Sequence, residues 1–341
     1  MQHYNLAMVG FGNVGQALAR LLLAKREELN ARYHVTFSVV GIATRRHGIA
    51  MNSQGLDLER ALAMMENGAS LGALSSETPP DNAFEFIRRC GADVLFETTP
   101  VNYQNGQPAV THLQLALEMG MHAITANKGP VVHAFRQLSQ LAVTRGRKFY
   151  FESAVMDGAP IFSLFREALP AVHLIAFQGI LNSTTNLMLT RMEEGETFER
   201  SLAYAQSIGI TETDPSGDID GWDAAIKVAA LVTVLMDFPL TPHQVERQGI
   251  RQLTSQAVMQ AKREGKRWKL VCRARRQGEG VQARVAPEQV LPTSPLYAVH
   301  GTSSLIQFET DVLSGLTVIE SDPGPQTTAY GLLADFLNAV R

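Results

Sequence analysis

The feature that most constrains this chain is a glycine-rich turn near its N-terminus, Gly10-Phe11-Gly12-Asn13-Val14-Gly15. It follows an apolar run typical of a buried strand, residues 5–9, and precedes a segment with helical periodicity, residues 13–31. In a G-x-G-x-x-G pattern the glycines permit a tight turn, a close approach of a pyrophosphate to the backbone, and close helix–strand packing. The N–H groups at the helix N-terminus then attract phosphates. The pattern predicts a dinucleotide site; a purely structural turn is the alternative.

The periodicity of the first 150 residues predicts an α/β fold, with a Rossmann-type doubly wound nucleotide-binding domain over residues 1–150. The expected strands cover residues 5–9, 35–43, 93–97, 123–126 and 148–151, and the expected helices 13–31, 112–119 and 133–144.

The pattern changes after residue 150, where we expect an α+β domain over residues 151–320 and a C-terminal segment over 321–341. The expected helices are 160–169, 186–205, 222–236 and 327–340, with a β-rich stretch over 268–320.

The composition excludes several classes of protein. The 341 residues carry a net charge of −3, which argues against a basic nucleic-acid binder or a disordered acidic chain. The longest apolar run, residues 228–236, is too short to span a bilayer, and no signal-peptide pattern opens the chain. Cys90 and Cys272 form neither a disulfide framework nor a zinc motif. We therefore expect a cytoplasmic protein that binds a small-molecule substrate, no nucleic acid and no membrane.

The end of the second expected strand bears on the choice of cofactor. Residues 40–46 contain no carboxylate that could accept a ribose 2′-hydroxyl, but they end in Arg45 and Arg46. Two guanidiniums can pair with a 2′-phosphate, so the segment favours NADP(H) over NAD(H). The alternative is that both arginines are solvated surface residues.

Carboxylates are densest just before the expected helix 222–236. Glu212, Asp218 and Asp223 are followed by Lys227, which shares a helix face with Asp223 because the two are four residues apart. An ordinary surface salt bridge is one interpretation. However, Lys227 enters the apolar run 228–236, and the carboxylates outnumber the lysine, which would suit a substrate bearing an amine.

Two further turns follow strands of the first domain. Lys128 comes just after the strand 123–126, and ligands in such folds bind beyond the carboxyl ends of the strands. Glu152 opens the turn 152–160; if it is buried it needs a partner, and a bound cation is one possibility.

These segments together resemble the homoserine dehydrogenase family, and the resemblance runs through nearly the whole chain. It rests on residues 10–15, 97–102, 125–130, 152–160, 179–186 and 212–227. The resemblance implies NAD(P)-dependent interconversion of L-aspartate 4-semialdehyde and L-homoserine, in the biosynthesis of threonine, methionine and isoleucine. The C-terminal regulatory extension of some family members is not expected here.

The resemblance also implies roles for individual residues. Lys227 would be the acid/base, with Lys128 between cofactor and substrate. The residues expected to hold the substrate are Glu212, Asp223, Thr184 and Asp218. The residues expected to contact the cofactor are Gly10, Phe11, Gly12, Asn13, Val14, Gly15, Arg45, Arg46, Thr99, Lys128, Gly209 and Gly324. Gly324 implies that the segment 321–341 returns to the first domain.

A cation and a partner subunit are implied in the same way. Main-chain groups of Glu152, Val155, Asp157 and Ala159 match a site for a monovalent cation, Na+ or K+, although Asp157 replaces a small residue of the family pattern. Family members pair through the second domain, so residues 151–320 would also serve dimerisation, in a homodimer or a higher homo-oligomer.

Two rival functions remain at this stage. A semialdehyde dehydrogenase that forms an acyl-enzyme needs an activated cysteine, and neither Cys90 nor Cys272 lies in a recognisable active-site turn. A non-catalytic dinucleotide-binding sensor of the same fold is the second rival; it would not need the two lysines and the carboxylates.

Overall fold

The computed structural model describes residues 2–211 and 213–341. The chain folds into two units, which are described separately here. The first contains the residues up to Gly158 together with Gly324–Arg341, and the second contains Ala159–Pro323. No helix among the described residues is long and apolar enough to cross a membrane.

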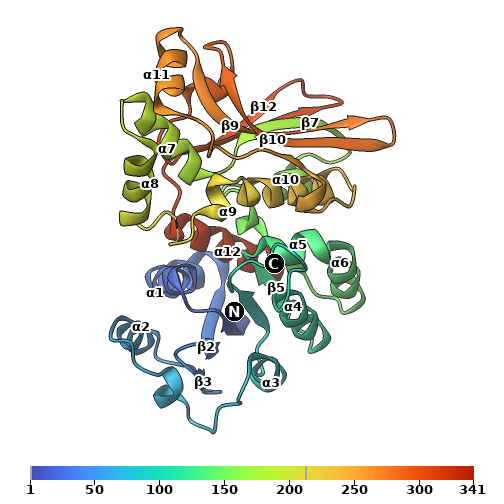
Figure 1. The fold of residues 1–341 in the computed structure, drawn as a ribbon. Coiled ribbons are helices and arrows are strands. Elements are labelled where there is room, and N and C mark those ends of the chain that lie inside the picture. The colour runs from blue at the N-terminus through green and yellow to red at the C-terminus, as the bar shows by residue number, and fades with distance from the viewer. Residues whose placement is uncertain (1, 212) are drawn as a thin grey trace. The chain divides into compact units, whose positions relative to one another are not determined.

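The first unit is built on a six-stranded sheet in the order β3-β2-β1-β4-β5-β6 (Figure 1). All neighbours are parallel except the β2–β3 pair, which is antiparallel. Its strands are β1 (Gln2–Val9), β2 (Val35–Ala43), β3 (Ile49–Met51), β4 (Val94–Glu97), β5 (His122–Thr125) and β6 (Phe149–Tyr150). The predicted Rossmann-type α/β class is confirmed. The strand order reverses between β1 and β4, where such folds bind their ligands.

The helices of the first unit pack around this sheet, and their apolar residues fill its core. They are α1 (Asn13–Tyr33), α2 (Leu58–Glu66), α3 (Ala83–Arg89), α4 (Ala109–Glu118), α5 (Lys128–His133), α6 (Phe135–Thr144) and α12 (Pro325–Val340), with short turns at Leu71–Leu74 and Glu152–Ala154. The helix predicted over 133–144 begins earlier and is interrupted at Ala134.

The last helix of the chain, α12, completes the core of the first unit. It packs against α1, and Phe336 is fully buried there. The Phe336 ring meets Tyr4 of β1 edge-on at 5.9 Å between centroids and Phe96 of β4 at 6.2 Å. The C-terminal segment is therefore part of the nucleotide-binding fold.

The second unit contains a second six-stranded sheet, in the order β12-β11-β7-β9-β10-β8. The neighbours are antiparallel except the β10–β8 pair. Its strands are β7 (Leu174–Ile180), β8 (Glu246–Arg247), β9 (Arg267–Gln277), β10 (Gly280–Val290), β11 (Ser304–Thr310) and β12 (Leu316–Glu320). Mixed helices and antiparallel strands confirm the predicted α+β character of this half.

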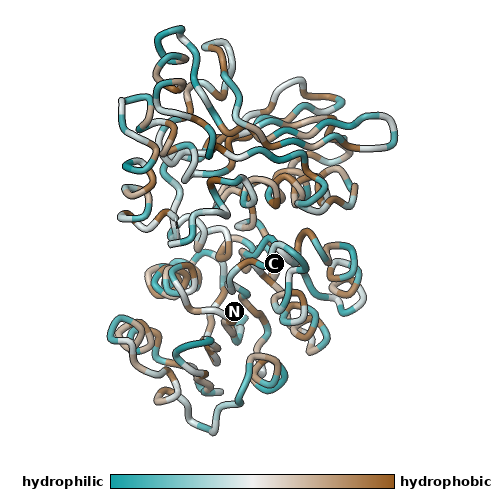
Figure 2. Tube along the Cα trace, in the orientation of Figure 1, coloured by the Kyte–Doolittle hydropathy of each residue, from teal (hydrophilic) through white to brown (hydrophobic). Residues whose placement is uncertain are grey.

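Helices α7, α10 and α11 pack against strands of this sheet. Figure 2 shows how apolar α10 is, and its residues Val228–Val232 are fully buried. The helices are α7 (Ser183–Glu193), α8 (Phe198–Ser207), α9 (Ser216–Ile219), α10 (Trp222–Leu235) and α11 (Ser255–Arg263), with short turns at Leu164–Ala168, Pro242–Gln244 and Pro295–Ala298.

Two helix predictions in this half are wrong. The helix expected over 186–205 is two helices, because Gly195 adopts a φ of +98° and Thr197 then caps α8 by accepting a hydrogen bond from the Arg200 backbone. The segment 160–169 forms only a π-helical turn at Leu164–Ala168.

A buried ion cluster joins α7 to β9 inside the second unit. Lys269 is fully buried, and its ammonium donates to the Asn186 side chain at 2.9 Å and to the Val299 carbonyl. Burial lowers the pKa of Lys269 to about 8 and raises the pKa of the nearby Glu193, which lies 3.7 Å from the Arg267 guanidinium. The cluster holds the far end of α7 against the sheet.

Candidate active site

The glycine-rich turn lies between β1 and α1, and its geometry explains two of the three glycines. Gly10 has a φ of +96°, and an added Cβ would lie 2.8 Å from the Thr98 carbonyl group. An added Cβ at Gly15 would lie 2.8 Å from the Gly10 carbonyl oxygen. These two positions cannot accept a side chain without moving the backbone of Thr98, directly after β4, or of the turn itself.

The third glycine is different, because nothing in the folded chain requires it. Gly12 has a φ of −79°, and among the described residues no atom lies within 4 Å of a Cβ added there. A side chain would project into open space at the N-terminus of α1. Glycine at this position therefore fits a group that approaches the backbone from outside, as a pyrophosphate does.

The other residues of the turn are held by the fold. Phe11 is buried in the core, α1 begins at Asn13, and Val14 packs at the edge of that core. The Phe11 carbonyl also accepts a hydrogen bond from the Gln16 side chain at 3.2 Å. The turn is thus rigid on its inner side and open at Gly12.

Arg45 and Arg46 lie directly beyond β2, the strand next to β1. Both are exposed, and among the described residues neither guanidinium has an ion pair or side-chain hydrogen bond. The turn is closed by Thr44, whose hydroxyl donates to the Gly48 carbonyl at 2.9 Å. The two charges therefore stay available at the carboxyl end of the strand.

A buried carboxylate that the sequence analysis did not single out lies at the end of β4. Glu97 is fully buried, and it accepts hydrogen bonds from the Thr99 backbone at 3.0 Å, from the Thr99 hydroxyl, and from the Thr125 hydroxyl at 2.9 Å. The buried His112 ring lies 3.9 Å away. Glu97 thereby fixes the loop that carries Thr99.

Lys128 is the first residue of α5, immediately after β5. Asn127 caps this helix by accepting from the Gly129 backbone at 2.9 Å, and its amide donates to the Thr99 carbonyl at 3.0 Å. The loops after β4 and β5 are therefore tied together, and Lys128 and Thr99 belong to one hydrogen-bonded group. Lys128 is itself half-buried.

The segment after β6 is anchored to α12. The Glu152 backbone donates to Asp335 at 2.7 Å, Ser153 donates to the Thr328 carbonyl at 2.7 Å, and the Asp157 carboxylate accepts from the Thr328 hydroxyl. Val155 is buried, and Asp157 has a left-handed φ of +44°. Gly324 lies at the start of α12, where its N–H donates to Thr327 at 2.8 Å.

In the second unit, Asp218 is the centre of a dense hydrogen-bond network. It accepts from the hydroxyl of Thr211 at 2.6 Å, from the amide of Asn182 at 2.7 Å and from the hydroxyl of Thr184 at 3.1 Å. Burial and the neighbouring Asp223 raise the pKa of Asp218. The predicted residues Thr184, Asp218 and Asp223 are therefore brought together.

Lys227 belongs to the same network. Its ammonium lies 3.2 Å from Asp223 and donates to the Leu181 carbonyl at 2.6 Å. Both side chains of the ion pair are mostly buried, with 14% and 15% of their surfaces exposed. This differs from an ordinary solvated surface pair, because desolvation strengthens the electrostatic interaction.

Three residues of this network were not predicted. Glu212 lies outside the described residues, and Gly209 ends the turn after α8 with a φ of +74°. Asn182, Thr211 and the Leu181 carbonyl were missed. The signal for Asn182 was available, since an asparagine before a helical segment is a common N-cap.

The comparisons with known proteins decide the family. The family model for homoserine dehydrogenase matches residues 160–337, and the model for the NAD-binding domain of homoserine dehydrogenase matches residues 10–152. The chain belongs to the homoserine dehydrogenase family.

Relatives of this family match over nearly the whole chain. An NAD(+)-dependent homoserine dehydrogenase of Pseudomonas canavaninivorans is 34% identical, over 99% of this chain and 96% of that protein. A homoserine dehydrogenase of Methanocaldococcus jannaschii is 35% identical over 98% of both proteins. The solved structure of a hyperthermophilic archaeal homoserine dehydrogenase in complex with NADPH matches with a TM-score of 0.83 and 27% identity, over 99% of this chain and 98% of that one.

The family membership makes this chain an NAD(P)-dependent oxidoreductase that acts on a CH–OH group. Membership of this family does not favour the alternative of a cysteine-dependent semialdehyde dehydrogenase. The environment of the two cysteines also argues against that alternative. Both cysteines are buried, and burial raises the pKa of Cys90 and raises that of Cys272 to about 12. An activated nucleophile needs the opposite shift.

Proposed function

We propose that this enzyme interconverts L-homoserine and L-aspartate 4-semialdehyde in the cytoplasm, as a step in threonine, methionine and isoleucine biosynthesis. The observation that carries the proposal is the mostly buried Asp223–Lys227 pair, joined to Asp218 and Thr184 in one network. The proposal assigns the cofactor to the first unit and the substrate to the second.

Lys227 is the acid/base in this proposal. A bound nicotinamide supplies or accepts the hydride. In the oxidation of homoserine, unprotonated Lys227 takes the proton from the substrate hydroxyl; in the reverse direction its ammonium returns the proton to the forming alkoxide. The Leu181 carbonyl and Asp223 fix the orientation of Nζ. Lys128 supplies a second positive charge beside the cofactor.

The carboxylates hold the amino group of the substrate. Asp218 and Asp223 provide negative charge in the network of Lys227, and Thr184 can accept from an ammonium because its own hydrogen is donated to Asp218. The proposal includes Glu212 among the carboxylates that bind the substrate. A substrate with an α-amino group is thereby preferred over a simple alcohol.

The cofactor site is formed by the turn Gly10–Gly15 together with Thr99, Lys128 and Gly324 of the first unit, and Arg45 and Arg46 select NADP(H) over NAD(H). The support is that both guanidiniums are exposed beyond β2 without a carboxylate partner. Equal rates with NAD and NADP would contradict this preference.

Main-chain groups of Glu152, Val155, Asp157 and Ala159 bind Na+ or K+ in this proposal. The support is a buried, well-anchored loop in which Asp157 adopts a left-handed conformation. Replacing K+ or Na+ by a large organic cation at constant ionic strength is expected to lower turnover, and unchanged turnover would contradict the site.

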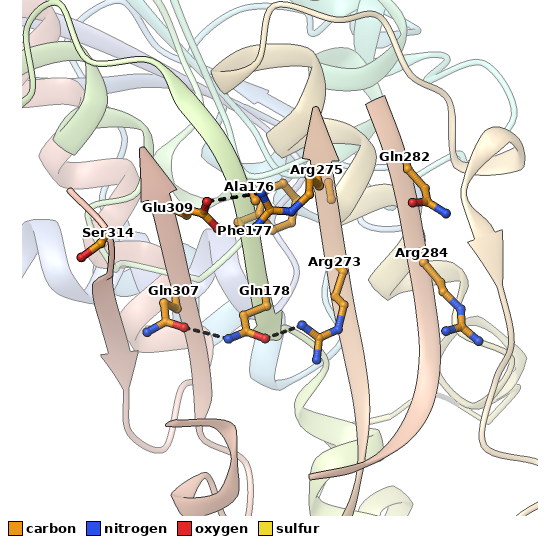
Figure 3. A pocket seen from close by; sticks show the side chains of 11 residues that line it. Ala176, Phe177, Gln178, Arg273, Arg275, Gln282, Arg284, Gln307, Glu309 and Ser314 are labelled. Carbon is orange, nitrogen blue, oxygen red and sulfur yellow. Dashed lines mark hydrogen bonds and ion pairs between the residues drawn. The ribbon is translucent and has the colours of Figure 1, made fainter. Parts of the chain in front are cut away.

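The second unit is proposed to pair two copies of the chain through the open face of its sheet. Figure 3 shows polar side chains of β7, β9, β10 and β11 on this face. They line an open groove of about 450 Å³. The Gln178 amide donates a hydrogen bond to the Gln307 side chain at 2.7 Å and accepts one from the Arg273 guanidinium. Arg275 forms an ion pair with Glu309. A face that carries polar side chains and charges of both signs suits a self-complementary twofold contact. Light scattering is expected to give twice the chain mass, and Arg273→Glu to give the monomer.

The decisive experiment follows nicotinamide absorbance with purified protein, L-homoserine and either NADP or NAD. Homoserine-dependent reduction supports the proposal. If the protein binds a cofactor but oxidises homoserine with neither NADP nor NAD, the result would favour the non-catalytic sensor instead.

A further inference from the structure

Asn182 occupies the junction between β7 and α7, directly before the helix that carries Thr184. The residue is buried, with 3% of its surface exposed. The side-chain oxygen caps α7 by accepting from the Thr185 backbone at 2.8 Å and from the Thr185 hydroxyl at 2.8 Å. Half of this amide therefore serves the helix.

The other half of the amide faces the carboxylates. Nδ2 donates to Asp218 at 2.7 Å and to Asp223 at 3.1 Å. Because one planar NH2 group makes both bonds, it sets the separation and orientation of two carboxylates that would otherwise repel each other. A neutral donor achieves this without adding a charge to the network.

The residue before Asn182 acts on the third member of the network. The Leu181 carbonyl accepts from Lys227 at 2.6 Å, while Asp223 holds the same ammonium at 3.2 Å. The Leu181 backbone thus contacts Lys227, and the Asn182 side chain contacts Asp223, the carboxylate partner of that lysine. The rigid end of β7 fixes both contacts.

We propose that Asn182 is a positioning residue for the acid/base lysine: its amide holds Asp218 and Asp223 in place, and its cap on α7 keeps the Leu181 carbonyl aimed at Lys227. The inference rests on the proposed role of Lys227 and assigns Asn182 no contact with the reacting atoms. Burial raises the pKa of the nearby Cys272 thiol to about 12, so this group stays neutral and does not compete for the ammonium.

The test separates the cap from the amide donor. Serine and aspartate are both good N-caps, so Asn182→Ser and Asn182→Asp keep the cap on α7 and lose the NH2 group. The matched control is Asn82→Ser at the N-cap of α3, where the side chain accepts from the Glu85 backbone at 3.0 Å. Each variant is assayed for homoserine oxidation over a range of pH, with thermal unfolding as the check on folding.

We expect Asn182→Ser to unfold within about 4 °C of wild type and to lose about 10- to 100-fold in kcat. The rising limb of its kcat profile, where Lys227 must lose its proton to act as a base, moves to lower pH because Asp223 no longer holds the ammonium firmly. Asn182→Asp places a third carboxylate in the network, so its rising limb moves to higher pH and kcat at neutral pH falls further. Asn82→Ser behaves as wild type.

A purely structural cap would not move the two limbs in opposite directions. Asn182→Ser with kcat within twofold of wild type and an unmoved limb, while Lys227→Ala is inactive, overturns this inference alone. Absence of homoserine oxidation by the wild-type enzyme, or full activity of Lys227→Ala, overturns the proposed function and the inference with it.

Discussion

Replacing Phe336 by alanine tests the role of α12 in the first unit. The ring is fully buried and meets Tyr4 and Phe96 edge-on, at centroid distances of 5.9 and 6.2 Å. Truncating such a phenylalanine costs about 3–5 kcal/mol through lost burial and the cavity left behind. The two aromatic contacts favour the middle of that range or above, so we expect about 4 kcal/mol. For a domain of about 150–250 residues this lowers the unfolding temperature by about 8–16 °C.

The assay compares two spectroscopic signals during heating. Both tryptophans, Trp222 and Trp268, lie in the second unit, so their fluorescence follows that unit, whereas far-ultraviolet circular dichroism follows both. The control is Tyr330→Ala on the same helix, where the side chain is 56% exposed and a change within about 0.5 kcal/mol is expected. If Phe336→Ala shifts the circular dichroism transition no more than Tyr330→Ala does, α12 does not complete the core as described.

Three further outcomes follow from the site and the buried cluster. Lys227→Ala is expected to lower kcat by about 10²- to 10⁴-fold with cofactor binding intact; a loss below tenfold would transfer the role to another base. Arg45→Ala combined with Arg46→Ala should raise the KM for NADP far more than the KM for NAD, and equal changes would mean that the pair is only surface. Because the pKa of Lys269 in the folded chain, about 8, lies below its unfolded value, the unfolded state binds more protons between about pH 8 and 10, and the free energy of unfolding rises with pH in that window. Urea unfolding of Lys269→Met at both ends of the window should lack this rise, and a parallel rise in the variant would refute the assignment.

The sequence predicted the framework of the first unit well because its signals are local. A strand, a glycine turn and a helix follow one another within residues 2–33, and each element shows its own periodicity. The break at Gly195 was missed because the apolar pattern of α7 continues in α8, although Gly195 and the N-cap residue Thr197 separate the two helices.

The site could be predicted only in part, for a similar reason. Asp223 and Lys227 are neighbours on one helix, so their pairing follows from spacing alone. Glu97 and Asn182 have hydrogen-bond partners that are distant in the sequence. Thr125 lies 28 residues from Glu97, and Asp223 lies 41 residues from Asn182. No periodicity encodes such a contact.

The second unit is inserted between the two segments of the first unit, and this order determines when each unit can complete its folding during synthesis. The ribosome makes residues 159–323 before it makes α12, which takes on the order of 10 to 30 s at about 5–20 residues per second. During that interval the apolar surface that Phe336 will cover stays exposed on the nascent first unit. The second unit is contiguous in the chain and can close first, so the N-terminal half of the enzyme is expected to be the last to mature and the one that chaperones protect.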